Sequence, residues 1–402
     1  MREGRVPDAW MSTLVDHWRG RQEWILQQQM ALTGIAAPTG AESARAMYLA
    51  TRFRELPDLN VRCDRHGNVC AQVACVAGTG ATHAAPLICL AHLDTVFAED
   101  TPLVMRREAQ VIHCPGIGDN GRGLAALLML AHLFDTTSVR QRLTRPIHLV
   151  ATVGEEGVGN LRGVRGWLDD HAATTDIAPH AMIAIDGPGD EAIVHRALGA
   201  LRLRLSIAGP GGHSWVDAHT ANPVHAIGHL VATITRLADA AEPGTTVAVT
   251  RMAGGESLTS VPIAAWAEVD VRSVSSQRLT HLREEILRLA HRCIAEEMAR
   301  HPRGTLTLQV TVLGERPAGG ISEHETLVRA AIAATEASGR TPRHAIASTD
   351  ANIPLARGIP AIAIGAGGTG GGAHTVDEWY DDRHGNVGIE RLVRLVLTLA
   401  AA

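Results

Sequence analysis

The chain has 402 residues, of which 46% are apolar and 20% charged, and its formal net charge is −5. This length favours two packed domains, and the nearly balanced charge argues against nucleic acid or an anionic membrane as the main partner. Every basic side chain is Arg, because the sequence contains no Lys, which excludes Schiff-base enzymes, pyridoxal-phosphate enzymes and P-loop NTPases.

The termini and the cysteines indicate the compartment. No apolar run reaches the length of a membrane span, and the N-terminus leads into an amphipathic stretch where a signal peptide would have an apolar core. The six cysteines form no CxxC pair and are expected to be buried, reduced thiols. We therefore expect a cytoplasmic protein with no membrane partner. The 21 histidines direct attention to metals and acid–base chemistry.

The first half of the chain alternates between helix and strand patterns. Apolar spacing predicts an amphipathic helix from about Trp10 to Gly34. Continuous apolar runs, typical of strands buried on both faces, occur at 86–92, 146–153 and 181–185. Shorter strands are expected at 60–63 and 69–76, and a helix of small residues at 121–134. This alternation predicts an α/β sheet with helices on both sides.

The middle of the chain has a different pattern. Leu201–Ile207 alternates strictly between apolar and polar residues, as a strand with one wet face does. A helix (223–240), two strands (245–252 and 261–272), a helix (276–300) and a strand (305–313) follow. This order is the split βαβ, ferredoxin-like arrangement. We therefore expect an inserted domain over residues 196–313. The flanking residues, 1–195 and 314–402, are expected to form one mixed-sheet α/β domain. Its last expected elements lie at 323–338, 359–364 and 387–401.

Acidic and histidine side chains stand where the predicted strands end, which is where open α/β sheets bind ligands. Each has a plain alternative on its own: a helix N-cap, a turn-initiating Asp or a solvated acidic pair. Together they offer two imidazoles and three carboxylates, which fits two divalent ions sharing one carboxylate, zinc above all, with manganese or cobalt also possible. The expected ligands are His92, Asp119, Glu156, Asp186 and His374.

Two further acids accompany this set. Glu155 precedes a proposed ligand, and because neighbouring side chains on an extended segment point in opposite directions, it is left as a general base. Asp94 lies two residues after His92 on the same strand face, so its carboxylate is expected to hydrogen-bond the imidazole and fix its tautomer.

The motifs resemble the cocatalytic dizinc peptidases that include peptidase T, carboxypeptidase G, aminoacylase and acetylornithine deacetylase. The similarity runs from about Trp24 to the C-terminus, and two segments, Ser348–Asn352 and Ala373–Trp379, are most similar to the peptidase T branch. The motifs that carry it are His92-Leu-Asp-Thr-Val, Gly118-Asp-Asn, Gly154-Glu-Glu-Gly, Asp186, Gly211-Gly-His213-Ser, Asp270-Val-Arg272, Ser348-Thr-Asp-Ala-Asn352 and Ala373-His-Thr-Val-Asp-Glu-Trp379.

This resemblance implies a role for each motif. One metal takes His92 and Asp186, the other takes Glu156 and His374, and Asp119 bridges them. Asp94 orients His92, and Glu155 is the acid–base catalyst. The inserted domain is a lid that pairs two subunits, so that His213 stabilises the oxyanion in the partner subunit's site. The substrate-binding residues implied are Arg272 and Asn352.

Three functions stay open on the sequence alone. The first is an aminopeptidase acting on di- or tripeptides. The second is a hydrolase of a non-peptide C–N bond, in an N-acyl amino acid or an aromatic amine, because Thr259 stands where family members often have Asn. The loop Gly365–Gly372 is also longer and richer in Gly than the family pattern. The third is an inactive binding protein on the same fold, which the complete ligand set and Glu155 argue against.

Overall fold

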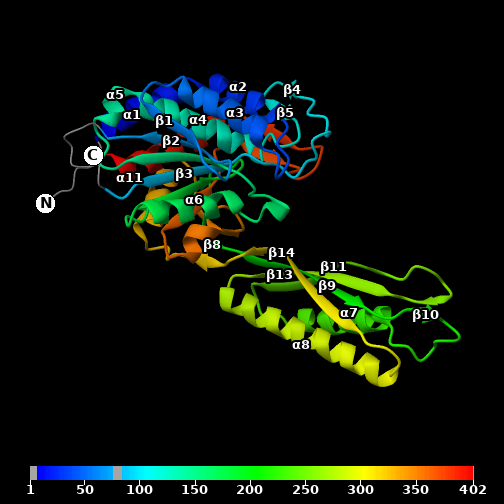
Figure 1. Cartoon of the computed structure of the whole chain (residues 1–402). Helices are drawn as coiled ribbons and strands as arrows, with labels where there is room; N and C mark the ends of the chain where they lie inside the picture. Colours follow the sequence, from blue (N-terminus) through cyan, green and yellow to red (C-terminus); the bar gives the residue numbers. More distant parts are fainter. Residues whose placement is uncertain (1–6, 76–83, 402) are drawn as a thin grey trace. The chain divides into compact units, whose positions relative to one another are not determined.

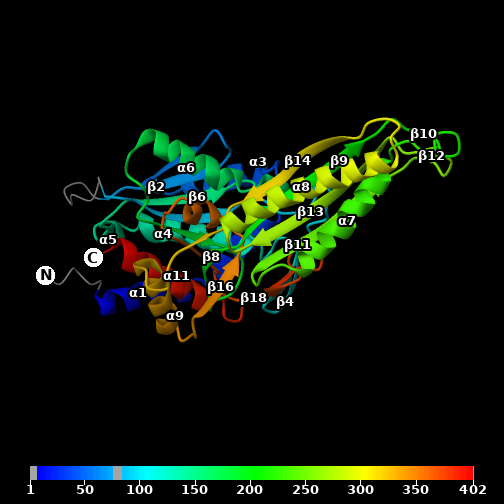
Figure 2. The same ribbon diagram turned by 90° about the horizontal axis from the view of Figure 1, so that it is seen from below.

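The computed structural model describes residues 7–75 and 84–401 and divides into two compact units (Figures 1 and 2). Unit 1 joins the chain up to Ala197 with the chain from Gly320 onward, and unit 2 is Leu198–Gly319. Each unit has its own sheet and its own hydrophobic core. Within the described ranges, no helix is long and apolar enough to cross a membrane.

The main sheet of unit 1 is mixed, as the sequence predicts. Its four central neighbours, β6, β3, β7 and β17, run parallel, while β1, β2 and β8 pair antiparallel. In sheet order the strands are β1 (Leu59–Cys63), β2 (Val69–Val73), β6 (Ile147–Thr152), β3 (Leu87–His92), β7 (Ala181–Ile185), β17 (Ala361–Ile364), β8 (Ala192–Ala197) and β15 (Gly319–Gly320), and β16 (Arg343–Ala347) pairs with β8. A small second sheet contains β18 (Thr369–Gly371), β19 (Trp379–Asp381), β5 (Val111–His113) and β4 (Arg106–Glu108).

Helices cover both faces of the main sheet (Figure 1). In β3, Leu87 and Cys89 pack into the core on one face, whereas Ile88 and Leu90 pack into the core on the other. This two-sided burial is why the strand is a continuous apolar run. The first face is covered by α1 (Asp8–Arg19), α2 (Gln22–Thr33), α3 (Ser43–Arg54), α4 (Gly121–Asp135), α5 (Thr137–Arg140), α9 (Thr326–Ala337) and α11 (Gly385–Ala400), and the second by α6 (Arg162–Thr174) and α10 (Asn352–Ala356).

The single helix expected over 10–34 is two helices, so that expectation was wrong. Helix α1 ends at Arg19 and α2 begins at Gln22. Gly20, which has the lowest helix propensity of any residue except Pro, is the C-cap of α1. Arg21 then leaves the helical region with φ −106° and ψ 17°. Both helices keep their apolar faces against the core, so the apolar spacing is continuous across a break in the backbone.

Unit 2 has the expected ferredoxin-like arrangement. Its elements are β9 (Gly199–Ala208), α7 (Pro223–Asp239), β11 (Thr245–Gly254), β13 (Ala264–Ser273), α8 (Ser276–Arg300) and β14 (Thr307–Arg316). The strands form an antiparallel sheet in the order β11-β13-β9-β14. Leu201, Leu203, Leu205 and Ile207 of β9 are buried in one core with residues of both helices, which explains their strict alternation.

Unit 2 also contains a small two-stranded antiparallel sheet. It pairs β10 (Gly212–His213) with β12 (Ser260–Val261). The strand expected over 261–272 therefore divides into β12 and β13 at Pro262, which has no N–H to donate to a sheet.

Candidate metal centre

The carboxyl ends of three neighbouring parallel strands bring polar side chains to one edge of the main sheet. His92 is the last residue of β3, Asp186 directly follows β7, and Glu155 and Glu156 come shortly after β6. These strands are adjacent and parallel, so their ends meet at the same edge. Two loops complete the group, with Asp119 just before α4 and His374 between β18 and β19.

The structure brings all five predicted ligands together. His92 Nε2 lies 3.0 Å from Asp119 Oδ1 and 3.8 Å from Asp186 Oδ1. His374 Nε2 lies 3.1 Å from Asp119 Oδ2 and 2.9 Å from Glu156 Oε1. The donor atoms thus form two groups, each with one imidazole and two carboxylates, and Asp119 belongs to both. One oxygen of Asp119 faces each group.

The chemistry of these donors fits a pair of divalent cations. Partly or fully buried carboxylates at such short spacing require compensating positive charge. Burial and the neighbouring Asp119 raise the pKa of Glu156. The hydrogen bond to Asp119 and the charge of Glu156 raise the pKa of His374 to about 9. In the metal-free chain, a proton on His374 therefore supplies part of the compensation, and a bound cation would replace it.

The hydrogen-bond partner of His92 Nδ1 is a main-chain carbonyl group. His92 Nδ1 lies 3.0 Å from the main-chain carbonyl oxygen of Asp94, whereas the nearer carboxylate oxygen is 3.7 Å away. The carboxylate is beyond hydrogen-bond distance but within ion-pair distance of the imidazole, so its role in orienting His92 stays a prediction. With Nδ1 donating to the carbonyl, Nε2 faces Asp119 and Asp186 and could offer its lone pair to an ion bound between them.

The Asp94 carboxylate also holds the acidic pair after β6. Its Oδ1 accepts the N–H of Glu155 and its Oδ2 accepts the N–H of Glu156, both at 2.9 Å. Thr39 Oγ1 also donates to Oδ2 at 2.9 Å. Although burial opposes ionisation, the nearby His92 and these N–H donors lower the pKa of Asp94 to about 2. Asp94 therefore ties the end of β3 to both acids as a carboxylate.

Glu155 lies beside the cluster but outside the two groups that share Asp119. Its side chain is buried, and one of its carboxylate oxygens is within 4.8 Å of donor atoms of His92 and Glu156. This places an additional carboxylate next to the candidate ions without making it one of the five predicted ligands.

Asn120 explains the glycine-rich turn around Asp119. Its Oδ1 accepts the N–H groups of Gly123 and Gly187, both at 3.0 Å, and its Nδ2 donates to the carbonyl of Ile185 at 2.9 Å. Asn120 is thus the N-cap of α4, which leaves the Asp119 side chain available to both imidazoles. A Cβ at Gly123 would lie 2.1 Å from Asn120 Oδ1 and 2.4 Å from the Ile185 carbonyl, so only glycine fits there.

Glu378 is a site residue to which sequence reasoning gave no role. Its Oε1 accepts the N–H groups of Gly118 (2.8 Å) and Asp119 (2.9 Å), and its Oε2 accepts that of Gly116 (2.6 Å). Its side chain is buried, and it follows His374 by four residues. Glu378 therefore fixes the Asp119 loop relative to the His374 loop. Its place in the motif Ala373–Trp379 is the signal that points to it.

We expect Glu378→Gln to weaken metal binding about 10–100-fold, the usual cost of losing a group that positions a ligand. One oxygen of the carboxylate becomes an NH₂ group, which cannot accept a hydrogen bond from the loop. Competition with a chromogenic chelator measures the affinity, and Glu323→Gln, which alters a carboxylate with 55% side-chain exposure, is the control. Equal affinity in Glu378→Gln and wild type would show that the loop holds its shape without this carboxylate.

Three other predicted residues lie elsewhere. His213 and Arg272 belong to unit 2, where His213 Nδ1 accepts the N–H of Trp215 at 3.1 Å and Arg272 Nε donates to Asp270 at 3.1 Å. Asn352 is in unit 1 but fully buried, and its Oδ1 accepts the N–H of Thr349 at 2.8 Å. Its side chain therefore stabilises the start of α10, and its contact with substrate stays a prediction.

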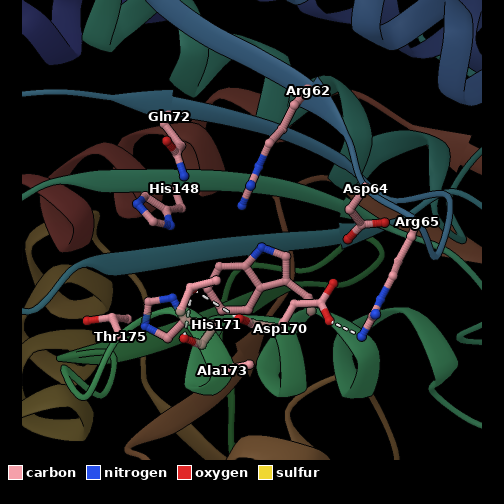
Figure 3. A pocket seen from close by; sticks show the side chains of 11 residues that line it. Arg62, Asp64, Arg65, Gln72, His148, Asp170, His171, Ala173 and Thr175 are labelled. Carbon is pink, nitrogen blue, oxygen red and sulfur yellow. Dashed lines mark hydrogen bonds and ion pairs between the residues drawn. The ribbon is translucent and has the colours of Figure 1, made fainter.

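A separate cavity in unit 1 has a volume of about 570 Å³ and contains none of the predicted site residues (Figure 3). Its walls include Arg62, His148, Trp167 and His171. The His171 ring stacks on Trp167 with 5.0 Å between centroids, and burial lowers the pKa of His148 to about 4. The indole face is thus already covered by a side chain of the protein.

Comparison with known proteins gives one sequence family and many similar folds. The model of a family described as "Peptidase family M20/M25/M40" matches residues 88–398. No curated protein matches the chain.

Three solved structures illustrate the likeness of fold. A tripeptidase from Staphylococcus aureus subsp. aureus Mu50 has 19% identity and a TM-score of 0.76, over 93% of this chain and 97% of that one. Aminopeptidase PepT from Bacillus cereus ATCC 10987 has 20% identity and a TM-score of 0.73, over 94% and 98%. A dinuclear metal-binding M20-family peptidase from Bacillus subtilis has 14% identity and a TM-score of 0.68, over 94% and 98%.

Proposed function

The chain belongs to peptidase family M20/M25/M40, and we propose that it is a metal-dependent aminopeptidase that removes the first residue of di- or tripeptides. One observation carries the proposal most directly. Asp119 directs one carboxylate oxygen to His92 and the other to His374, and Glu155 lies beside the same cluster. The similar folds of a tripeptidase and an aminopeptidase support the choice of short peptides.

The proposed metal ligands follow the two groups of donor atoms. His92 and Asp186 would hold one ion, Glu156 and His374 would hold the other, and Asp119 would contact both. Zinc suits imidazole and carboxylate donors, and manganese or cobalt would also be accepted. When bound, such ions polarise a carbonyl group and make water more acidic.

Glu155 is the proposed proton carrier. Its carboxylate accepts a proton from the attacking water as the water oxygen bonds to the scissile carbonyl carbon. Glu155 then gives that proton to the amide nitrogen, so that the C–N bond breaks and a neutral amine leaves. The hydrogen bond from the N–H of Glu155 to the carboxylate of Asp94 holds the main chain at residue 155, and this limits the positions that the Glu155 carboxylate can take.

The residues of unit 2 complete the proposal. His213 would donate a hydrogen bond to the oxyanion of the tetrahedral intermediate, and Arg272 would bind a carboxylate or carbonyl of the substrate. His213 is exposed in the two-stranded sheet of β10 and β12, as a group that contacts another subunit would need to be. We propose that unit 2 pairs two subunits and that each His213 serves the partner subunit's site.

Mixing two inactive variants tests this exchange. In a heterodimer of Glu155→Gln and His213→Ala, one site combines both defects and the other has both wild-type residues. Random pairing of equal amounts makes about half of the dimers heterodimers, so about a quarter of wild-type activity should return. Differently tagged subunits show that exchange has occurred. Exchange without recovery of activity would mean that His213 acts within its own chain.

A substrate panel tests the reaction itself. Di- and tripeptides with free N-termini should be cleaved in the presence of zinc, manganese or cobalt, and N-terminally acetylated peptides should not. A second candidate is a hydrolase of N-acyl amino acids or aromatic amines, which Thr259 in place of the family's common Asn favours. Cleavage of N-acyl amino acids together with no cleavage of free peptides would select that candidate.

We also propose a cytoplasmic location. Five of the six cysteines are buried as free thiols, whereas Cys63 is exposed, so the expected burial was wrong for that one. Burial raises the pKa of Cys89 to about 12. Reduced, unreactive thiols are common in cytosolic proteins. Fractionation of cells that express the chain tests the location.

A further inference from the structure

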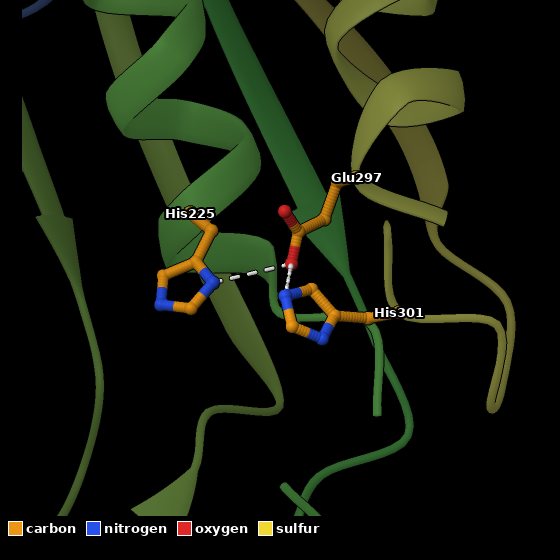
Figure 4. Close-up of side chains that lie close together, drawn as sticks. All are labelled: His225, Glu297 and His301. Carbon is orange, nitrogen blue, oxygen red and sulfur yellow. Dashed lines mark hydrogen bonds and ion pairs between the residues drawn. The ribbon is translucent and has the colours of Figure 1, made fainter. Parts of the chain in front are cut away.

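Unit 2 contains a second cluster of side chains that bind metals (Figure 4). His225 lies in the first turn of α7, Glu297 in the last turn of α8, and His301 directly after α8. Both imidazoles face the same carboxylate oxygen, with His225 Nδ1 at 3.2 Å and His301 Nε2 at 3.9 Å from Glu297 Oε1. One donor atom from each residue lies within 4.8 Å of the other two.

Glu297 is a charged group in a buried position. Its side chain is only 1% exposed, and a buried carboxylate is costly unless positive charge or hydrogen bonds compensate it. The N–H of Asn222 donates to Oε1 at 3.1 Å, and Arg300 Nη2 lies 3.9 Å from Oε2. Among the residues that the structure describes, Oε1, the oxygen that faces both imidazoles, thus has only a neutral backbone donor and His225 within hydrogen-bond distance.

His301 is not held by this carboxylate through a hydrogen bond. Its Nε2 is beyond the distance at which a hydrogen bond forms. Its Nδ1 is buried, and no atom in the described part of the chain accepts or donates a hydrogen bond there. The ring nevertheless points Nε2 at Glu297 (Figure 4). A purely hydrogen-bonded trio leaves this geometry unexplained, whereas an ion between the three donors accounts for it.

We propose that His225, Glu297 and His301 form a binding site for one divalent cation of the zinc class. Two imidazoles and one carboxylate are a known set of protein ligands for zinc. The side chain of His225 is 53% exposed, so a fourth position is open to water and the ring can turn towards the ion. The site shares no residue with the cluster of unit 1, and it does not depend on the proposed peptidase activity.

An ion at this site would join segments that the backbone already brings together. It would link the start of α7 to the end of α8, beside the place where the N–H of Ala221 donates to the carbonyl of Arg303 at 2.9 Å. Asn222, which donates to Glu297, is also the N-cap of α7. The residues between His213 and α7 form one connecting segment, and this segment ends beside the proposed ion. The ion would therefore stabilise the end of the segment that joins α7.

Counting bound ions tests the site. We expect equilibrium dialysis of the full chain against increasing zinc to show one ion fewer per chain in His225→Ala/His301→Ala than in wild type. The control pair, His281→Ala/His291→Ala, removes two exposed histidines from α8 and should keep the wild-type count. Equal counts in wild type and His225→Ala/His301→Ala, or the same loss in the control pair, would overturn the site.

A second measurement isolates unit 2. In a chain with His92→Ala and His374→Ala, zinc should still raise the midpoint of thermal unfolding, because an ion that binds only the folded state stabilises it. That rise should disappear when His225→Ala is added, and circular dichroism of the metal-free variant checks that it is folded. No effect of His225→Ala on the zinc-induced rise would contradict the proposal. Because the readout is the difference between paired variants, it keeps its meaning even if the chain proves to have no peptidase activity.

Discussion

Glu155→Gln is expected to lower the turnover number about 10²–10⁴-fold, which is the usual contribution of a general base. The amide has nearly the same size as the carboxylate but cannot accept the proton of the attacking water. The main-chain N–H of residue 155 still donates to Asp94 in this variant, so the local fold should be preserved. Steady-state kinetics on the best peptide of the panel measures the loss.

The metal content of the same variant decides how the loss is interpreted. Since Glu155 is not one of the five proposed ligands, Glu155→Gln should bind as many ions as wild type. Glu191→Gln, which alters an exposed carboxylate of unit 1, is the matched control and should keep full activity. A variant at position 155 with near wild-type turnover would give Glu155 a structural role. A variant that loses its metals would make it a ligand.

The sequence predicts that His92 and Asp186 lie close together because each stands at the end of a recognisable strand. Residues His92 and Asp186 end continuous apolar runs, and such runs indicate strands buried on both faces of a sheet. Parallel pairing then places their ends at one edge without further information. The strict alternation of Leu201–Ile207 likewise predicts a sheet with one covered face, because periodicity reports burial directly.

Contacts made by the main chain are what the sequence does not reveal. Spacing puts Asp94 on the same strand face as His92, yet the imidazole bonds the carbonyl of Asp94 and not its carboxylate. Glu378 accepts hydrogen bonds from three main-chain N–H groups of a glycine-rich turn that lies 259 to 262 residues earlier in the sequence, so these bonds depend on how that turn folds. Such bonds involve backbone atoms that every residue possesses, so residue types carry little information about them.

Helix boundaries show the same limit in a simpler form. The apolar spacing from Trp10 to Gly34 is compatible with one helix, because α1 and α2 both pack on the same core. Only the local conformation at Gly20 and Arg21 separates them. A pattern that records which residues are buried is insensitive to a short break between two helices on the same face.

Removal of the metals is expected to abolish hydrolysis. Protons on the imidazoles would then compensate the carboxylates of the cluster, as the raised pKa of His374 indicates. Because only a neutral imidazole binds metal, zinc that binds again releases these protons. Dialysis against a strong chelator should therefore give a folded, inactive chain. Added zinc should restore the activity, and circular dichroism before and after dialysis shows whether the fold is retained.

The most direct test of the account is the number of metal ions that activity requires. The variant His225→Ala/His301→Ala lacks the proposed site of unit 2, and dialysis against a chelator removes its remaining metal ions. When zinc is then added, activity should rise to its maximum as about two ions bind per chain, counted by elemental analysis. An X-ray structure at that point should place the ions about 3.5–4 Å apart, the spacing usual for paired metal sites, with Asp119 between them. Full hydrolytic activity in a chain shown to be metal-free would contradict the central claim.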